Sequence, residues 1–304
     1  MSKGIKNISK KLLILASLFL PLHAYAQAKF TEIDGSILYS EYFPNPKSEF
    51  KGTIIFQNGS GTSLREWTDN KTFFNCVRRH GSALVYDRSG LGKSPPDFSI
   101  SSEKPTTAQL VNSKLRRLLK RKRIKAPYIL VSHSYGGLYA GYFARKYPDL
   151  IAGILMVDPV PRNYQYSNQI LEKFRLTRSK LKNKSSKEVY RLDNLKSPRE
   201  SNIMTADSFY QQLGFDETKK QVAELPRMTS KFPITIISSS DMNKNTLVKG
   251  DWYALQKQWL NRNPESMISQ VLGGHFLQLD RPKLICKELN KLVEIAIQSS
   301  TTRQ

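Results

Sequence analysis

Ser134 lies in a segment whose residue types and spacing could activate a nucleophile. The chain reads Ser132-His133-Ser134-Tyr135-Gly136 at the point where an apolar run gives way to a helical segment. A turn this tight requires small residues two positions before and two after the nucleophile, and Ser132 and Gly136 meet that requirement. Glycine is the usual first residue, so Ser132 is a mild departure. The segment predicts a serine hydroxyl that is exposed above a sheet and can attack a carbonyl carbon.

A serine nucleophile needs a base, and the chain offers few histidines for that role. Of its four histidines, His23 lies in a predicted signal peptide, His80 precedes a predicted strand, and His133 lies within the turn itself. Only His275 follows the serine in the chain. It comes in a Gly-Gly-His-Phe sequence after the apolar segment 267–272. We therefore predict that His275 accepts the serine proton, and an ordinary surface-loop histidine is the alternative.

Two aspartates could orient this histidine. Asp158 ends the apolar segment 153–157, and Asp241 follows the apolar segment 234–238. Either carboxylate could accept the Nδ1 hydrogen of His275 and stabilise the imidazolium that forms during the reaction. The turn at Asp241 lacks the glycine that commonly shapes such a loop, whereas an Asp-Pro step such as that at Asp158 is often only a turn former. Both remain candidates, with a slight preference for Asp158.

The negative charge that develops during attack needs two backbone N–H groups. Tyr135, the residue after the nucleophile, supplies one. The second should come from the glycine-rich turn 58–61 (Asn-Gly-Ser-Gly), which follows the apolar segment 53–57, with the Ser60 N–H as the best candidate. Removal of one such donor typically raises the barrier by about 2.7–4 kcal/mol. An ordinary turn at the end of a strand is the alternative.

Taken in chain order, these segments resemble the α/β-hydrolase superfamily from about residue 51 to residue 292, with a gap in the middle. The resemblance rests on the turn 58–61, the segment 85–94 (Val-Tyr-Asp-Arg-Ser-Gly-Leu-Gly-Lys-Ser), the serine turn, the segment 153–159 and the His275 loop. It implies an α/β fold, with a mostly parallel sheet and helices on both faces, and serine hydrolase activity like that of bacterial members. Haloalkane dehalogenases and epoxide hydrolases of this superfamily look similar but use an aspartate nucleophile. The shared segments do not separate esterases, lipases, peptidases, amidases and acyltransferases.

Alternating strands and helices must position these residues, and that alternation predicts right-handed crossovers and a mostly parallel sheet. A hairpin is expected at Asp34-Gly35. The expected strands are 53–57, 83–87, 128–132, 153–157, 234–238 and 267–272, and the expected helices are 64–79, 107–122 and 135–146.

The alternation is interrupted between residues 161 and 231 by a polar, lysine-rich and broadly helical stretch. An insertion at this place resembles the helical cap found over the active site in many α/β-hydrolases, and a surface excursion without a role in the site is the alternative. The predicted organisation is a signal peptide (1–26), a catalytic core (27–160 and 232–304) and a cap (161–231).

The N-terminal segment indicates export. A basic region is followed by the apolar stretch 12–22 and then by small residues that offer Ala-x-Ala cleavage after Ala26 or Ala28. The stretch is too short to cross a membrane, since spanning takes about 20 apolar residues. We therefore expect a secretory signal peptide and a periplasmic or extracellular mature protein.

The net charge of +23 raises the question of a nucleic-acid partner, most of all at segment 114–125, which holds eight basic residues in twelve. However, leucines and a valine of this region fall on one helical face, so a helix packed on the sheet with a solvated basic face is expected. No nucleic-acid motif accompanies it. Signal removal takes away four lysines and leaves +19, which could attract the protein loosely to anionic surfaces.

The chain has two cysteines, Cys76 and Cys286. In the resembled fold the two helices that carry them usually lie on the same face of the sheet, so a disulfide is possible in an oxidising compartment. Two buried free thiols are the alternative. We expect no metal site, because the histidines lack close ligand spacing, and the proposed chemistry requires no cofactor.

These observations together predict an exported serine hydrolase that cleaves a small-molecule ester, in preference to an amide, through an acyl-enzyme. The alternative is an acyltransferase, an amidase or a peptidase that uses the same serine, histidine and aspartate. A non-catalytic binding protein of this fold is the third hypothesis.

Overall fold

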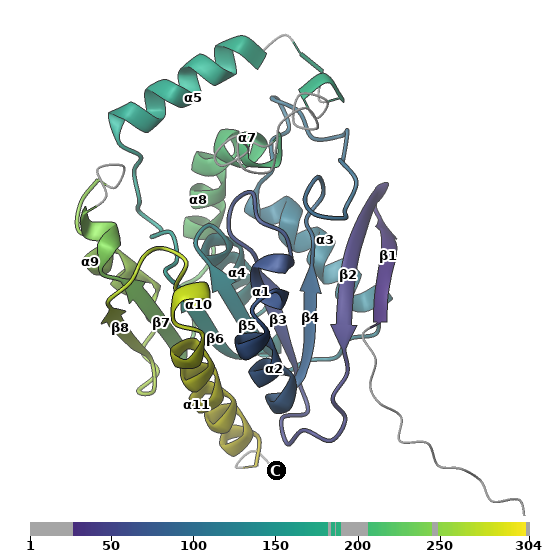
Figure 1. The fold of residues 1–304 in the computed structure, drawn as a ribbon, viewed down its shortest axis with the longest axis vertical. Helices are drawn as coiled ribbons and strands as arrows, with labels where there is room; N and C mark the ends of the chain where they lie inside the picture. Colours follow the sequence, from purple (N-terminus) through teal and green to yellow (C-terminus); the bar gives the residue numbers. More distant parts are fainter. Residues whose placement is uncertain (1–26, 182–183, 186, 190–205, 245–248, 302–304) are drawn as a thin grey trace, which may run out of the picture.

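An eight-stranded sheet with the strand order β1-β2-β4-β3-β5-β6-β7-β8 lies at the centre of the protein (Figure 1). The computed structural model describes residues 27–181, 184–185, 187–189, 206–244 and 249–301. The first two strands pair antiparallel, β2 pairs antiparallel with β4, and every other neighbouring pair is parallel. The strands are β1 (Gln27–Ile33), β2 (Ser36–Phe43), β3 (Thr53–Gln57), β4 (Ser82–Tyr86), β5 (Tyr128–His133), β6 (Ile151–Val157), β7 (Ile234–Ser239) and β8 (Met267–Val271).

Helices cover both faces of this sheet, so the predicted α/β-hydrolase fold is confirmed. The central strands are buried on both faces, as expected of parallel strands between two helical layers. Side chains from α3, α4 and α8 pack on one face, and side chains from α2 and α11 pack on the other. The helices are α1 (Arg65–Thr68), α2 (Lys71–His80), α3 (Ala108–Arg121), α4 (Gly136–Lys146), α5 (Asn168–Leu181), α7 (Ala206–Leu213), α8 (Phe215–Glu224), α9 (Trp252–Gln256), α10 (Leu277–Asp280) and α11 (Pro282–Thr301).

Two local predictions have different outcomes. The hairpin is present, and Asp34 (φ 52°) and Gly35 (φ 74°) both adopt the left-handed conformation that its tight turn requires. The continuous helix expected over 64–79 is wrong, because the chain forms α1 and then α2. Asn70 separates the two helices and accepts a 3.1 Å hydrogen bond from the Phe73 amide, so it caps the start of α2.

The basic helix α3 departs from prediction at one residue. Its leucines at 115, 118 and 119 are buried, as the helical periodicity predicts. Lys114 is also buried instead of solvated. It forms an ion pair with Asp97, and its Nζ donates to Ser36 Oγ at 2.8 Å. The pairing lets this cation lie inside the fold, because a buried charge needs a nearby opposite charge and hydrogen-bond partners.

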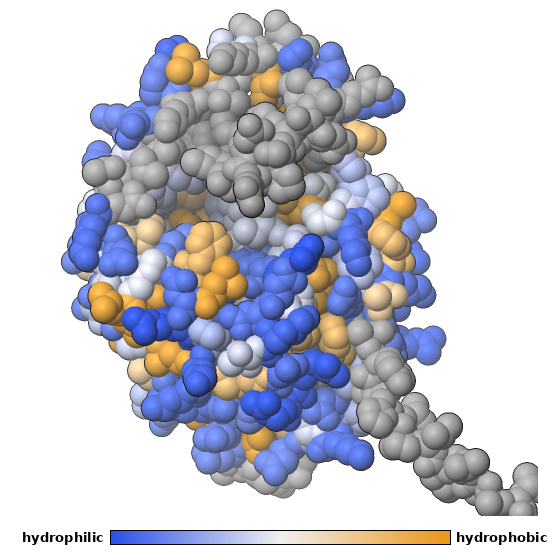
Figure 2. Space-filling model, viewed as in Figure 1, coloured by the Kyte–Doolittle hydropathy of each residue, from blue (hydrophilic) through white to orange (hydrophobic). Residues whose placement is uncertain are grey.

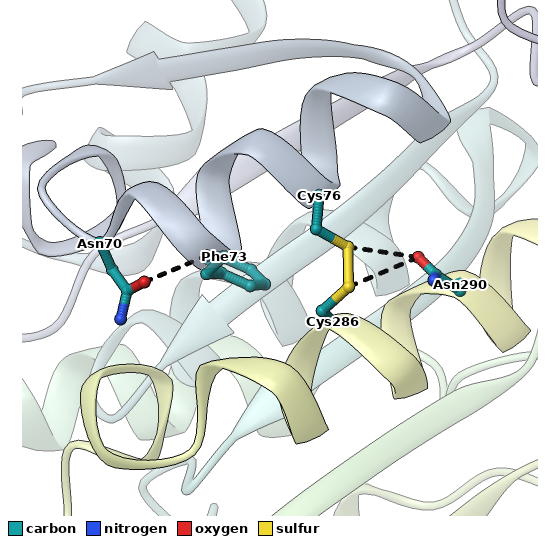
Figure 3. The surroundings of a disulfide bond; sticks show 5 residues. All are labelled: Asn70, Phe73, Cys76, Cys286 and Asn290. Atoms are coloured by element: carbon teal, nitrogen blue, oxygen red, sulfur yellow. Dashed lines mark hydrogen bonds between the residues drawn. A yellow bond between two sulfur atoms is a disulfide. The ribbon is translucent and has the colours of Figure 1, made fainter.

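Of the two alternatives for the cysteines, the structure has the disulfide (Figure 3). Cys76 on α2 and Cys286 on α11 have their Cα atoms 6.1 Å apart, and the bridge joins positions separated by 210 residues. Asn290, one turn further along α11, lies beside it. The bridge therefore links the two helices that cover one face of the sheet.

Three described helices, α5, α7 and α8, lie between β6 and β7 in the chain, within the predicted cap segment 161–231. Figure 1 shows α5 and α7 beyond the carboxyl ends of the central strands. Helix α8 instead packs against α4, since Phe215 and Val222 belong to the core on that face. The predicted signal peptide (1–26) and part of the cap segment fall outside the described residues. Within the described part of the chain, no helix has both the length and the apolarity needed to cross a membrane.

Candidate active site

Ser134 occupies a sharp turn between β5 and α4. Its φ of 52° lies in the left-handed region, which is unusual for a residue with a side chain and typical of strained functional turns. Two positions after Ser134 require glycine for steric reasons. A Cβ on Gly136 would lie 2.3 Å from the Gln57 carbonyl oxygen, and a Cβ on Gly137 would lie 2.6 Å from Pro159. The local sequence thus allows the turn to pack tightly against the ends of β3 and β6.

His275 reaches this serine from the loop between β8 and α10. Its Nε2 atom lies 2.8 Å from Ser134 Oγ, and its Nδ1 atom lies 2.5 Å from Asp158 Oδ2. The His275 side chain is 25% exposed, whereas the Asp158 side chain is fully buried. The three side chains therefore form a continuous hydrogen-bonded series that runs from a buried carboxylate to a partly accessible hydroxyl.

Asp158 is held in place by more than the histidine. Its Oδ1 atom accepts hydrogen bonds from the Ser239 amide (3.0 Å), Trp252 Nε1 (2.7 Å) and Gln256 Nε2 (3.0 Å). Burial alone would raise the pKa of Asp158. The hydrogen bond and charge of His275, followed by the Ser239 and Trp252 hydrogen bonds, instead lower that pKa below its ordinary value. The carboxylate thus stays ionised at neutral pH and keeps the histidine ring oriented.

The structure does not bring Asp241, the second candidate acid, to the histidine. Asp241 begins a 3-10 turn, η2 (Asp241–Lys244), and its Oδ1 atom lies 3.3 Å from Lys244 Nζ. Its side chain is 45% exposed. Strand β7 ends at Ser239, whose amide donates to Asp158, so the end of that strand supports Asp158 instead of supplying an acid.

The two predicted oxyanion donors lie on neighbouring turns. Within the described ranges, neither the Ser60 nor the Tyr135 amide donates a hydrogen bond to another residue. The buried Arg88 guanidinium donates to the carbonyl oxygens of Asn58 (2.9 Å) and Gly59 (2.6 Å). Because the C=O and N–H of a trans peptide point in opposite directions, the Ser60 N–H faces away from Arg88. Arg88 therefore fixes the orientation of this turn.

Helix α7 of the predicted cap contacts both donor residues through side chains. Gln211 Oε1 accepts a 2.7 Å hydrogen bond from Ser60 Oγ, and the Gln211 carbonyl accepts a 3.0 Å bond from the Tyr135 hydroxyl. Asp207, also on α7, lies 3.9 Å from Arg88. The described part of the cap segment thus makes polar contacts with Ser60 of the turn 58–61, with Tyr135 and with Arg88, and sequence reasoning missed these contacts.

Sequence reasoning also missed a buried carboxylate, Glu66 of α1. It accepts hydrogen bonds from the Gly59 amide (2.9 Å), Thr62 Oγ1 (2.5 Å) and Gln278 Nε2 (2.7 Å), and it forms an ion pair with His133 Nδ1. Burial raises the pKa of Glu66, but the charge and hydrogen bond of His133, together with the hydrogen bonds from Thr62 and Gly59, lower it below its ordinary value.

His133 has an acceptor at each ring nitrogen. Its Nδ1 atom faces Glu66, and its Nε2 atom lies 2.9 Å from the His275 carbonyl oxygen. Both nitrogens can donate only when the ring is protonated. Burial lowers the pKa of His133, but the Glu66 charge, the Glu66 hydrogen bond and the His275 carbonyl together raise it above its ordinary value. The contacts of His133 therefore favour its protonated form beside the turn that carries Ser134. The only sequence signal for this role is a polar residue in a buried turn.

The surface around the histidine loop is partly apolar. Figure 2 shows apolar side chains gathered over α10 on a face that is otherwise largely hydrophilic. Phe276 and Leu279 of this segment are 42% and 45% exposed. The Phe276 ring lies 5.6 Å from that of His275, so an apolar group borders the hydrogen-bonded series of Ser134, His275 and Asp158.

Comparison with curated proteins gives a relative of nearly equal length. The uncharacterized protein YqjL of Bacillus subtilis is 27% identical over 263 residues, which cover 86% of this chain and 90% of that protein. A rice (Oryza sativa) protein named probable 1-acylglycerol-3-phosphate O-acyltransferase is 28% identical over 128 residues, which cover 41% of this chain and 30% of that protein.

Solved structures show the same fold. The haloalkane dehalogenase DbeA of Bradyrhizobium elkanii matches with a TM-score of 0.64 and 19% identity over 91% of this chain and all of that chain. The epoxide hydrolase CorEH matches with a TM-score of 0.62 and 14% identity over 88% of this chain and 98% of that chain. The sequence profile of the alpha/beta hydrolase family matches residues 54–288. The chain therefore belongs to the alpha/beta hydrolase family.

Proposed function

We propose that this protein is an exported serine hydrolase that cleaves a carboxylic ester, and an amide less readily, through an acyl-enzyme. One observation carries the proposal: His275 is within hydrogen-bond distance of both Ser134 Oγ (2.8 Å) and Asp158 Oδ2 (2.5 Å). A nucleophile, a base and an orienting acid in this geometry are the groups that acyl transfer requires.

In the proposed reaction, Ser134 Oγ attacks the carbonyl carbon while His275 Nε2 takes the serine proton. Asp158 stabilises the resulting imidazolium through Nδ1. The Ser60 and Tyr135 amides receive the oxyanion. His275 then returns the proton to the leaving alkoxide as the ester bond breaks. A water molecule, deprotonated by the same histidine, attacks the acyl-enzyme, and His275 returns this proton to Ser134 Oγ as the acyl–oxygen bond breaks and the acid is released.

The type of nucleophile separates this proposal from the chemistry of the structural neighbours. The superfamily's dehalogenases and epoxide hydrolases use an aspartate at the turn, where this chain has Ser134. An aspartate attacks a saturated carbon and forms an ester, whereas a serine with a histidine base is suited to acyl transfer. Phe276, exposed beside His275, supports a substrate with an apolar portion.

A series of p-nitrophenyl esters with acetyl, butyryl and octanoyl groups tests this proposal. We expect measurable kcat/KM on at least one ester and a fall in kcat on the order of 10⁴–10⁶-fold in Ser134→Ala. Ser113→Ala, on α3, is the matched control and should keep the parent rate. Equal turnover by parent and Ser134→Ala on every ester would contradict the assignment.

Acyl transfer to an acceptor other than water is the second candidate, because the rice relative is named a probable O-acyltransferase. Product analysis with added alcohols and amines distinguishes the two. Transfer products that exceed free acid while water remains in large excess would favour the acyltransferase.

Export is tested separately by expression in a secretion-competent bacterium. N-terminal sequencing should find the mature chain beginning after Ala26 or Ala28, outside the cytoplasm. Retention of the intact N-terminus in the cytoplasm would contradict export without affecting the proposed chemistry.

A further inference from the structure

A cavity on the α4 face of the core, which we call the arginine groove, is lined by five cationic side chains. Its volume is about 510 Å³, and its lining includes Met228 and Trp259. The cations come from segments far apart in the sequence: the end of α4, the residues after β6, the residues after α8, and η3 (Lys257–Trp259) with the loop that follows it. They are Arg145, Arg162, Arg227, Lys257 and Arg262.

The arginine groove has no acidic residue in its lining. Within the part of the chain that the structure describes, none of its five cations forms an ion pair with a carboxylate. Unpaired cations are common on the surface of so basic a chain, because water solvates them at little cost. A ligand site requires something further, namely a cation that water does not fully solvate.

Arg145 supplies that feature, because it is only 7% exposed. Its Nη1 atom donates to the carbonyl oxygens of Val222 (3.0 Å) and Leu225 (3.3 Å) at the end of α8. Through these bonds, one nitrogen of the guanidinium caps the C-terminal end of α8. The Nε atom is buried without a hydrogen-bond partner among the described residues, and an unsatisfied buried donor of a charged group is costly.

Two neighbouring cations add to the positive electrostatic potential around Arg145. Burial, followed by the charges of Arg162 and Arg227, lowers the pKa of Arg145 to about 10. The group is therefore still charged at neutral pH. Three guanidinium groups that repel one another around one cavity are stabilised most directly by a bound anion.

We propose that the arginine groove binds a phosphoryl oxyanion, either inorganic phosphate or pyrophosphate or the phosphate group of a small organic ester. Planar guanidinium groups match the oxygen geometry of phosphate and bind it through paired hydrogen bonds. The cavity is larger than a phosphate ion, and the partly exposed Leu260 in its lining can contact an organic portion.

The arginine groove is connected to the acid of the candidate active site through the chain. Gln256, which immediately precedes η3, donates to Asp158 Oδ1 and to the Pro159 carbonyl at 2.8 Å. Trp259 Nε1 donates to the Val160 carbonyl at 3.0 Å. A ligand in the groove would thus contact segments that already meet at the end of β6, beside Asp158. Its binding should therefore stabilise the fold as a whole.

Isothermal titration calorimetry of the full chain with inorganic phosphate and with pyrophosphate, in Tris buffer against sodium chloride at matched ionic strength, tests the proposal. We expect saturable one-site binding, a rise in Tm with each phosphate ligand, and about ten-fold or greater weakening in Arg162→Gln and in Arg227→Gln. Arg145 is left unchanged because it also caps α8. Lys120→Gln, an exposed cation on α3, is the control and should bind as the parent does.

A lipid headgroup could present the same phosphoryl chemistry, so a sedimentation assay compares phosphatidic acid vesicles with phosphatidylcholine vesicles. Arg227-dependent binding to phosphatidic acid, but not to free phosphate or pyrophosphate, would identify a membrane headgroup as the source. No binding to any of these ligands would overturn the proposal. An equal loss in Lys120→Gln and Arg227→Gln would do so as well, because it would show general charge attraction.

Discussion

Glu66 and His133 form an ion pair whose side chains are 2% and 1% exposed. Glu66 also holds the turn 58–61 through the Gly59 amide, and His133 holds the carbonyl group of His275. One buried pair thereby connects the turn that carries a proposed oxyanion donor, the residue before the proposed nucleophile and the loop of the proposed base. We expect the relative positions of these three segments to depend on it.

Glu66→Gln should be strongly destabilising. The change keeps the side-chain shape but removes the counter-charge that the buried His133 ring faces. Breaking a buried pair in this way costs about 3–5 kcal/mol, and the free energy of unfolding from urea denaturation should fall by that amount. Asp69→Asn is the matched control, because Asp69 pairs with Arg65 on the surface of the same region, where a pair contributes about 0–1 kcal/mol. Similar losses in both variants would contradict the role of the buried pair.

The stability of the protein should depend on pH on both sides of neutrality. The pKa of His133 is raised above 6.5 in the fold, where Glu66, His275 and Asp158 face it, so its contribution is complete below pH 6.5 and is lost as the pH rises through the raised pKa. The lowered pKa values of Glu66 and Asp158 give a contribution that is present above their ordinary values of 4.5 and 3.8 and is lost as the pH falls. Urea denaturation across this range should show both slopes, and the alkaline slope should be reduced in Glu66→Gln. An alkaline slope of the same size in that variant would assign it to another group.

Asp158→Asn and Asp241→Asn should have very different effects on turnover. Asparagine at position 158 keeps the geometry but removes the charge that stabilises the imidazolium, and loss of this charge in a serine triad lowers kcat by about 10⁴-fold. Asp241 contacts Lys244 at the surface, so its replacement should leave kcat at the parent level. Steady-state kinetics on one good ester decides the point, and a large loss confined to Asp241→Asn would reverse the assignment of the acid.

The disulfide should contribute measurably to stability. It joins α2 to α11 across 210 residues of chain, and bridges that close long loops typically stabilise by about 2–4 kcal/mol. Denaturation of the parent with and without reductant, compared with the Cys76→Ala/Cys286→Ala variant, measures this contribution. Reductant should not affect the double variant. Coincident transitions for the oxidised and reduced parent would show that the bridge is absent or has no effect on stability.

Much of the fold could be predicted from the sequence because the central strands are continuous apolar runs that end in turn residues. The segment 53–57 coincides with β3, and the segments 128–132 and 153–157 lie within β5 and β6. The position of Ser134 followed from the same pattern, since only small residues allow the turn after β5. These features depend on neighbouring residues and are therefore readable from local sequence.

The contacts that sequence reasoning missed depend on distant segments. Glu66 and His133 are far apart in the chain, and no spacing rule indicates that a carboxylate of α1 reaches the residue before Ser134. The choice between Asp158 and Asp241 has the same origin, because it depends on where β7 ends relative to the His275 loop. The helical pattern predicts a solvated basic face for α3, but Lys114 is buried because its partner Asp97 lies in a loop that this pattern does not describe.

Covalent labelling of the purified protein by a fluorophosphonate probe, with mass mapping of the labelled peptide, tests the central claim most directly. The probe reacts only with a serine whose hydroxyl is activated by a base. We predict labelling of Ser134 in the parent and its loss in Ser134→Ala and in His275→Ala, with Ser113→Ala labelled like the parent. A folded parent that remains unlabelled, or that is labelled at a different serine, would contradict the assignment of Ser134 as an activated nucleophile.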